Sequence, residues 1–215
     1  EYYNNKKESI KLDTLKYLIG PDLLIQKKPY IRIARPNNLE DNIGFHKDTM
    51  YGQSTYEMSV HTPLVNLNSK SCLKFVPFSH MFNEKKIKLN KNLININNKV
   101  KKNSYLHKLG FPYDPKRIDI ANFSCKNFNV KLGEYVLFSP ALIHGQEINK
   151  DKSTTRFSFD TRITNVYSPI NLENRGANGK YDNFNISAIT TLSNDYIKSQ
   201  KWKWKEIVLF VIKKN

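Results

Sequence analysis

The spacing of apolar residues predicts one helix near the start of the chain, followed by many short strands. Over residues 9–25 apolar side chains recur at roughly helical spacing, and Gly20 and Pro21 form a stop signal. Alternation of apolar and polar residues then predicts strands at 29–35, 55–67, 72–78, 134–138 and 156–163. One helix followed by many short strands favours a mainly β fold with supporting helices, built on a jelly-roll core.

Residues 82–129 interrupt this pattern with a Lys/Asn-rich stretch that gives way to one rich in Pro, Tyr and Arg. Only residues 93–97 alternate, and weakly. A stretch of this length between core strands is either a surface excursion or a functional lid, so we expect an insertion here. The apolar run within 201–214 predicts a closing strand or helix packed on the core. Together these features predict a single domain over residues 1–215.

The chain is strongly basic, with 35 Lys and Arg against 19 Asp and Glu and a formal charge of +16. Such a charge can indicate nucleic acid or a small anionic ligand. The basic residues lie in scattered short runs, however, so a solvated basic surface is the preferred interpretation. Cys72 and Cys125 are too few for a disulfide framework. With no visible membrane span or signal peptide, we expect a cytoplasmic protein without a membrane partner; its oligomeric state stays open.

His46 and Asp48 are the first candidates for chemistry. Residues two apart on an extended backbone project to the same side, so an imidazole and a carboxylate can converge on one ion. Iron(II) in oxygenases is held on one face by two histidines and one carboxylate, which leaves positions for a co-substrate and O2. His144, which follows a strand and a Pro turn, is well placed as the third ligand. Neither the H-x-D triplet nor the single histidine is specific by itself.

The predicted strand at 156–163 adds a third element. One face of it carries four polar residues: Arg156, Ser158, Asp160 and Arg162. The opposite face carries Phe157, Phe159 and Thr161. A polar face of this kind is costly if it is buried and unused. Because an arginine fork binds carboxylates and serine adds a donor, we expect Arg156 and Ser158 to hold the distal carboxylate of 2-oxoglutarate. We also expect Asp160 to pair with Arg162.

The order of these features resembles the 2-oxoglutarate oxygenases with a double-stranded β-helix, cupin-like core. More narrowly, three segments resemble the phytanoyl-CoA dioxygenase-like group: GFHKDTMYG, LNSKSCLKFVPFSH and GEYVLFSPALIHGQEIN. They resemble that group's H-x-D segment, its N-G-x-L-x-x-x-P-G-S-H-like turn and its G-D-x-x-x-F-x-x-x-x-x-H-G-S segment. Phe78 stands where the group has the glycine of its turn. The resemblance covers residues 30–80 and 130–165.

The resemblance implies an enzyme that uses Fe(II), 2-oxoglutarate and O2. It implies three metal ligands: His46, Asp48 and His144. It implies Arg156 as the arginine that binds the co-substrate, with succinate and CO2 as co-products. Relatives that halogenate place a small residue at the position of Asp48, so its presence favours hydroxylation.

Other residues of the expected pocket follow less directly. His61 stands where relatives place an aromatic residue beside the co-substrate, so the resemblance implies that it lines the same pocket. Arg35 and Tyr51 flank the metal segment and are candidates to face the substrate. The basic segment 82–129 is expected near the active-site mouth. It would suit a small anionic substrate, such as a sugar phosphate, a nucleotide-linked sugar, an acyl thioester or a carboxylated metabolite.

Two alternatives remain beside the small-molecule hydroxylase. The spacing of Arg156 and Arg162, together with the basic charge, also fits a nucleic-acid demethylase of the same chemistry. The long interval between Asp48 and His144 and the scattered basic residues disfavour it. A non-catalytic relative that binds a ligand in its barrel is the other alternative, against which the intact ligand set argues.

Overall fold

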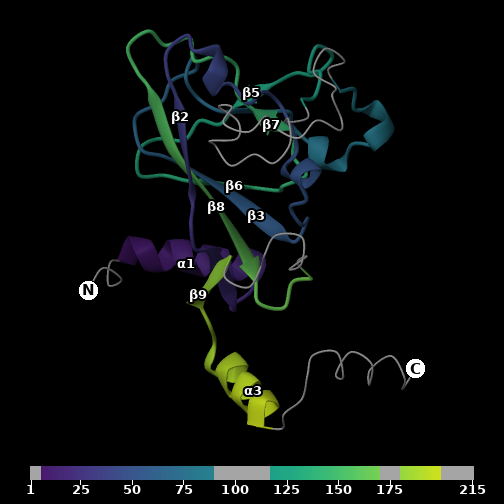
Figure 1. The fold of residues 1–215 in the computed structure, drawn as a ribbon. Coiled ribbons are helices and arrows are strands. Elements are labelled where there is room, and N and C mark those ends of the chain that lie inside the picture. Colours follow the sequence, from purple (N-terminus) through teal and green to yellow (C-terminus); the bar gives the residue numbers. More distant parts are fainter. Residues whose placement is uncertain (1–5, 90–116, 170–179, 200–215) are drawn as a thin grey trace, which may run out of the picture.

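The computed structural model describes residues 6–89, 117–169 and 180–199, which form a mainly β fold with two α-helices (Figure 1). The helices are α1 (Lys6–Ile19) and α3 (Ala188–Ser199). The strands are β1 (Leu23–Gln26), β2 (Tyr30–Ala34), β3 (Glu57–Pro63), β4 (Lys74–Phe75), β5 (Lys126–Asn127), β6 (Val136–Phe138), β7 (His144–Gly145), β8 (Arg156–Asn165) and β9 (Tyr181–Asn185). These strands form two antiparallel sheets, and α3 stands away from them at one end of the molecule.

The larger sheet has six strands and is organised around β8. On one side β8 pairs with β3, from Thr164 opposite Glu57 to Ser158 opposite Pro63. On its other side it pairs first with β2 and then with β1. β6 extends the sheet beyond β3, and β9 extends it beyond β1. The strand predicted at 156–163 is therefore confirmed, and the structure adds that it extends to Asn165 and lies at the centre of the larger sheet.

The smaller sheet has the strand order β5-β4-β7 and is continued by a single bridge between His46 and His144. The strand predicted at 72–78 contracts to Lys74–Phe75. Turns at both ends explain the difference, because the N–H of Cys72 donates to the Asn68 carbonyl and that of Ser79 to the Val76 carbonyl.

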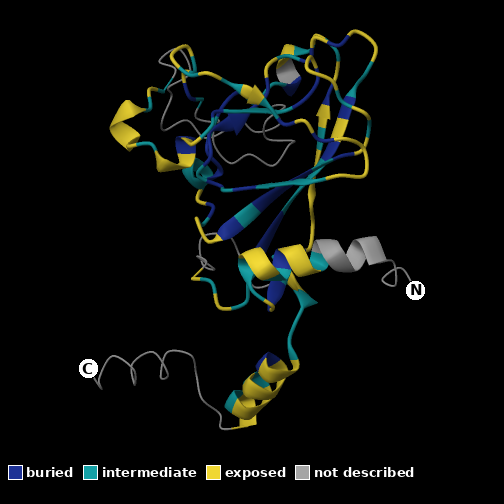
Figure 2. Ribbon diagram, turned by 180° about the vertical axis from the view of Figure 1, so that it is seen from behind, coloured by how far each residue is buried: buried dark blue, intermediate teal, exposed yellow. Residues whose placement is uncertain are grey.

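Helix α1 ends at the predicted stop. Gly20 has a φ of 105° and its N–H donates to the carbonyl of Lys16, a glycine-type helix end. β1 follows almost at once and was not predicted as a strand. The helix and the larger sheet share one buried cluster: Leu15, Leu23, Val60 and Ile163. Figure 2 shows this arrangement, with the dark blue strands of the sheet against a helix whose outer side is exposed.

The described ends of the 82–129 segment belong to the core. Leu89 forms a bridge with Ile118, and the N–H of Ile118 donates to the carbonyl of Phe45 at 2.7 Å. Ile118 and Phe45 pack in a second cluster with Val76 and Ile143. Phe45 and Ile143 directly precede the two candidate metal-binding histidines, so the segment is anchored beside the metal motifs. The alternation at 93–97 and the apolar run at 201–214 lie outside the described residues.

The turn before the 3-10 helix Ser79–Met81 contains an unusual backbone conformation. Phe78 has a φ of 61°, in the left-handed region that glycine adopts without strain. Its side chain is 68% exposed, so packing gives little compensation. The following Ser79 is fully buried, and its Oγ accepts a hydrogen bond of 2.7 Å from the N–H of Ile143. The turn therefore supports the chain immediately before His144.

Candidate metal centre

Backbone pairing brings the two candidate histidines together. The N–H of His46 donates to the carbonyl of His144 at 2.8 Å, and the N–H of His144 donates back at 3.0 Å. This reciprocal exchange defines a hydrogen-bonded pair of antiparallel residues. Asp48 follows two residues later, at the start of the 3-10 helix Asp48–Tyr51. The helix turns the chain so that the carboxylate faces the histidine pair.

The three side chains converge. Oδ1 of Asp48 lies 3.5 Å from Nε2 of His46 and 3.7 Å from Nε2 of His144. One ligand atom from each residue lies within 4.8 Å of the other two. Among the residues that the structure describes, no other group of three or more His, Cys, Asp or Glu side chains meets this spacing. The cluster can hold one metal ion.

Each histidine is oriented by its other ring nitrogen. Nδ1 of His46 lies 3.1 Å from the Gly44 carbonyl, and Nδ1 of His144 lies 2.9 Å from the Leu142 carbonyl. A carbonyl only accepts, so Nδ1 carries the hydrogen and Nε2 keeps the lone pair that a metal needs. Burial lowers the pKa of His144 to about 4, although the Asp48 charge opposes the shift. That ring is neutral near pH 7.

Asp48 is also held through the atom that does not face the histidines. Its Oδ2 accepts hydrogen bonds from Ser59 Oγ at 2.7 Å and from Arg162 Nη2 at 2.9 Å. Burial by itself would raise the pKa of Asp48, but the charge of Arg162 and the two neighbouring histidines together outweigh burial and hold the pKa well below its usual value. The carboxylate is therefore ionised and oriented.

The predicted pair between Asp160 and Arg162 is wrong. Arg162 bonds Asp48, and its Nε donates to the side-chain oxygen of Gln53 at 2.7 Å. Asp160 instead accepts from Arg32 Nε and lies 3.0 Å from His61 Nδ1. The cause is sheet register: His61 lies directly opposite Asp160, and β2 brings Arg32 alongside.

One pocket is lined by all three candidate ligands, His46, Asp48 and His144. It is lined by residues of the larger sheet, of β7 and of the loop before the H-x-D motif: Arg32, Ile43, Gly44, His46, Asp48, His61, Leu73, Phe138, His144, Gly145, Gln146, Arg156, Ser158, Asp160 and Arg162. All four polar residues predicted on one face of β8 are among them. The structure thus places the metal cluster, His61 and the polar face of β8 around one space.

Burial along β8 is the reverse of the usual pattern. Arg156 is 4% exposed and Ser158 is fully buried, whereas the aromatic Phe157 between them is 37% exposed. Nε of Arg156, Oγ of Ser158 and Nε2 of His61 are buried, and none of them has a hydrogen-bond partner among the described residues. Burial lowers the pKa of Arg156 to about 10, so the guanidinium stays charged near pH 7. Buried polar groups of this kind need a partner from outside the described side chains, such as a water molecule or a ligand.

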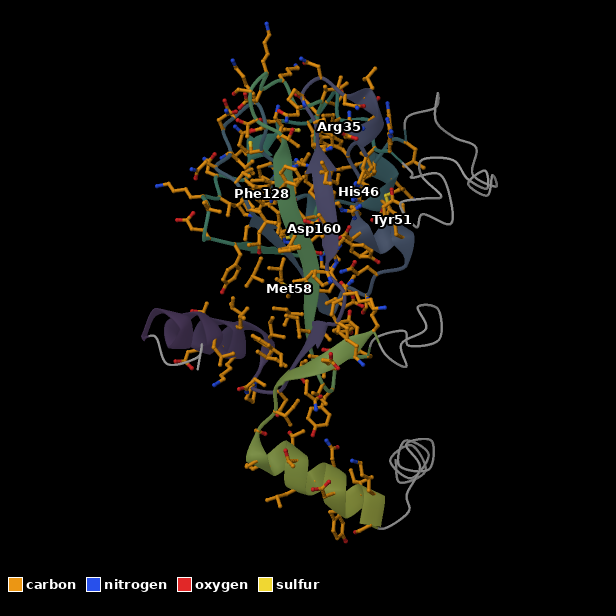
Figure 3. The ribbon with its side chains drawn as sticks, turned by 60° about the vertical axis from the view of Figure 1, so that its left-hand side comes forward. Arg35, His46, Tyr51, Met58, Phe128 and Asp160 are labelled. Atoms are coloured by element: carbon orange, nitrogen blue, oxygen red, sulfur yellow. The ribbon has the colours of Figure 1, made fainter. Side chains whose placement is uncertain are left out.

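The two residues predicted to face the substrate are not among those lining the pocket. The guanidinium of Arg35 donates two hydrogen bonds to the carboxylate of Asp41, from Nε to Oδ2 at 2.9 Å and from Nη2 to Oδ1 at 2.8 Å. Tyr51 packs edge-on against His46, with ring centroids 5.3 Å apart. Figure 3 labels both residues, near Asp160. Burial, and then the Asp48 charge, raise the pKa of Tyr51 above its usual value. Both residues support the walls of the site.

Sequence reasoning missed two residues of the site, Arg32 and Gln146, and it gave no physical reason for Gly145, which matches the H-G-S segment of the resembling group. Arg32 is the one charged residue of strand β2 and lies opposite Ser158. Its place in the pocket follows from the pairing of β2 with β8, which the sequence of β2 alone does not indicate. Gln146 lies two residues after His144, the same spacing that joins His46 to Asp48. Gly145 is required by close packing, because an added Cβ would lie 2.7 Å from the carbonyl carbon of Gly44.

Comparisons with known proteins leave the family open. No family model matches the sequence, and no curated protein matches it. Solved structures with partial similarity include three enzymes. The nickel complex of the non-heme monooxygenase ThoJ has a TM-score of 0.46 and 19% identity, covering 72% of this chain and 49% of that one.

The other two structures are complexes with 2-oxoglutarate, also called alpha ketoglutarate. The epimerase SnoN, in complex with Fe3+, alpha ketoglutarate and nogalamycin RO, has a TM-score of 0.49 and 14% identity, covering 83% of this chain and 67% of that one. EvdO2 from Micromonospora carbonacea var. aurantiaca, complexed with 2-oxoglutarate, has a TM-score of 0.46 and 13% identity, covering 77% and 64%. The chain spans about half the length of ThoJ. Similarities at this level do not place it in a family. Among the described residues, no helix has the length and apolar character needed to span a membrane.

Proposed function

We propose that this chain is a non-haem iron(II), 2-oxoglutarate-dependent oxygenase that hydroxylates a small molecule. One observation carries the proposal. A single pocket contains both a His-Asp-His cluster and a buried arginine whose Nε lacks a partner within residues 6–89, 117–169 and 180–199. The cluster by itself suits several divalent metals. The buried guanidinium can bind a carboxylate, which indicates an organic acid beside the metal.

The ligand set fits iron(II). His46 and His144 present Nε2 atoms, and Asp48 presents one carboxylate oxygen, so the three donors come from one side. Two histidines and one carboxylate on one face of the ion leave the remaining positions for other ligands. When bound, iron with 2-oxoglutarate and O2 supplies oxidation of a C–H bond, with succinate and CO2 as co-products. Asp48 would occupy one coordination position of the bound iron, which favours hydroxylation over halogenation.

The pocket also fits the co-substrate. A buried guanidinium is stable only when an anion or hydrogen-bond acceptors offset its desolvation, and a carboxylate offers both. Arg156 and Ser158 alternate on one strand and both have buried, unpartnered donor atoms, so one carboxylate can bind both. His61, fixed by Asp160, brings a third polar atom to the same pocket. The protein thereby orients the diacid and shields it from water.

The wider assignment rests on the sequence motifs and the sheet arrangement. We infer that the two antiparallel sheets form a double-stranded β-helix, and that the chain is phytanoyl-CoA dioxygenase-like within residues 30–80 and 130–165. Residues 1–215 then form one oxygenase domain, with 82–129 at the active-site mouth. The bond from Ile118 to Phe45 supports that position, because Phe45 directly precedes a proposed ligand. A nucleic-acid substrate stays an untested alternative.

Succinate formation tests the proposal. Wild-type protein with Fe(II), 2-oxoglutarate and O2 should convert 2-oxoglutarate to succinate, slowly without substrate. His46→Ala and Asp48→Ala should abolish the conversion, and Arg156→Ala should raise the 2-oxoglutarate concentration needed by at least tenfold. His80→Ala is the matched control, because His80 is exposed and lies outside the pocket lining. Equal succinate formation by wild type and Arg156→Ala would contradict the assigned co-substrate site.

A further inference from the structure

Gln146 lines the pocket and has a buried hydrogen-bond acceptor. The proposed co-substrate does not use this acceptor. The residue is 6% exposed and lines the same pocket as the metal cluster. Its Oε1 is buried, and no group in the described part of the chain forms a hydrogen bond with it. An acceptor in this state has lost its hydration and regains the lost free energy only from a donor.

The orientation of the Gln146 amide is fixed. Its Nε2 donates to the backbone carbonyl of Asp41, a group that can only accept, so exchanging the amide nitrogen and oxygen would leave two acceptors facing each other. Asp41 is itself held, because Arg35 binds its carboxylate through the backbone N–H, Nε and Nη2. Oε1 is therefore the atom left to meet a ligand.

The chemistry of 2-oxoglutarate does not meet this need. At neutral pH its two carboxylates and its keto group are all acceptors, whereas the unpartnered atoms of Arg156 and Ser158 are donors. The pocket thus has donors on β8 for the diacid and a separate acceptor just after β7. Resting on the function proposed above, we infer that Gln146 is a specificity residue that accepts a hydrogen bond from an O–H or N–H group of the primary substrate.

This assignment narrows the substrate class. His144 and Gln146 lie two residues apart, and both line the pocket, so the donor group of the substrate binds close to the metal. Ile43, Leu73 and Phe138 supply apolar wall in the same pocket. A substrate with an apolar skeleton and a hydroxyl or N–H near the oxidised carbon satisfies both features. A hydrocarbon or an ether lacks the donor.

The test uses matched probes on protein loaded with Zn(II), which does not turn over, and 2-oxoglutarate. Calorimetry first measures whether the protein binds the metal and 2-oxoglutarate. Absence of binding in this first step would overturn the proposed function, and it is distinguished in this way from a failure of the inference about Gln146. Dissociation constants for cyclohexanol and cyclohexyl methyl ether are then measured by ligand-observed NMR, on loaded and on metal-free protein. The variants are Gln146→Leu and, if that variant does not fold, Gln146→Met. The matched control is Gln26→Leu.

Gln26 is a suitable control because its environment resembles that of Gln146 but lies outside the pocket. It is 7% exposed, its Nε2 donates to the Lys28 carbonyl, and its Oε1 is also unpartnered, yet it does not line the pocket. We expect wild type and Gln26→Leu to bind the alcohol about tenfold more tightly than the ether, and the Gln146 variants to lose the preference. Equal binding of alcohol and ether by wild type would overturn the inference, as would an unchanged preference in the Gln146 variants. Either result would indicate that Oε1 serves a water molecule.

Discussion

At the scale of single residues, each proposed ligand is held through an atom that points away from the metal position. The histidines are fixed by Nδ1 to backbone carbonyls, and Asp48 is fixed by Oδ2 to Ser59 and Arg162. Such contacts set the ring orientation and the charge of a ligand before any metal binds. The site is therefore organised by its neighbours as much as by its ligands.

Ser59→Ala tests this dependence. Ser59 is fully buried and its hydroxyl donates to the atom of Asp48 that does not face the histidines. Its loss leaves Arg162 as the remaining donor to that oxygen, so we expect metal affinity to fall by about 10- to 100-fold while the protein stays folded. Metal titration of wild type and variant gives the ratio. Ser71→Ala, at another buried serine outside the pocket lining, should leave the affinity unchanged. Equal affinities for Ser59→Ala and wild type would show that Asp48 needs no such support.

The candidate ligands could be predicted from the sequence because their signals are local. His46 and Asp48 share a short motif, and the polar face of β8 follows from strict alternation. The partners of Asp160 and Arg162 could not be predicted, because they depend on which residues of β3 and β2 lie opposite β8. Register is set by the whole sheet, and no single strand encodes it.

At the scale of elements, the turn at Phe78 links a backbone strain to the metal segment. Phe78 occupies a left-handed conformation, and the next residue, Ser79, holds the N–H of Ile143. Phe78 stands where the turn of the group that the sequence resembles has a glycine. Its φ of 61° is one that glycine adopts without strain. The turn therefore contains a strained residue at Phe78, and the hydrogen bond from the Ile143 N–H to Ser79 Oγ is still formed.

Phe78→Gly should stabilise the protein. Glycine adopts this φ without the penalty of about 1 kcal/mol or more that a side chain brings, and little burial is lost because Phe78 is mostly exposed. Since glycine also gains freedom in the unfolded chain, we expect a net gain of roughly 0.5–1 kcal/mol in the free energy of unfolding. Denaturant unfolding measures it. Phe78→Ala keeps the strain and should give no gain; a similar gain for both variants would refute the explanation.

At the scale of the whole molecule, the pocket is lined by residues of both sheets. The larger sheet contributes the polar face of β8, and the smaller sheet contributes His144 on β7. The mainly β architecture and the position of the helix stop were predictable from periodicity. β1 was not, because four residues directly after a helix stop carry no alternation long enough to read. The meeting of the two sheets depends on contacts distant in sequence.

The basic charge of +16 has no assigned role at this scale. The pocket itself contains three arginines among its lining residues, balanced in part by two aspartates. Arg162 and Arg32 are committed to Asp48 and Asp160 respectively. Arg156 is the member whose Nε lacks a partner, which makes it the centre of the co-substrate proposal.

The most direct test of the central claim is the binding of 2-oxoglutarate measured by calorimetry under anaerobic conditions, with and without Fe(II). We predict that wild type binds 2-oxoglutarate, that Fe(II) tightens this binding because the keto acid shares the metal, and that His46→Ala removes the Fe(II) effect. Arg156→Ala should weaken binding whether or not Fe(II) is present. Wild-type protein that binds neither Fe(II) nor 2-oxoglutarate, or whose affinity for 2-oxoglutarate is indifferent to both substitutions, would contradict the account.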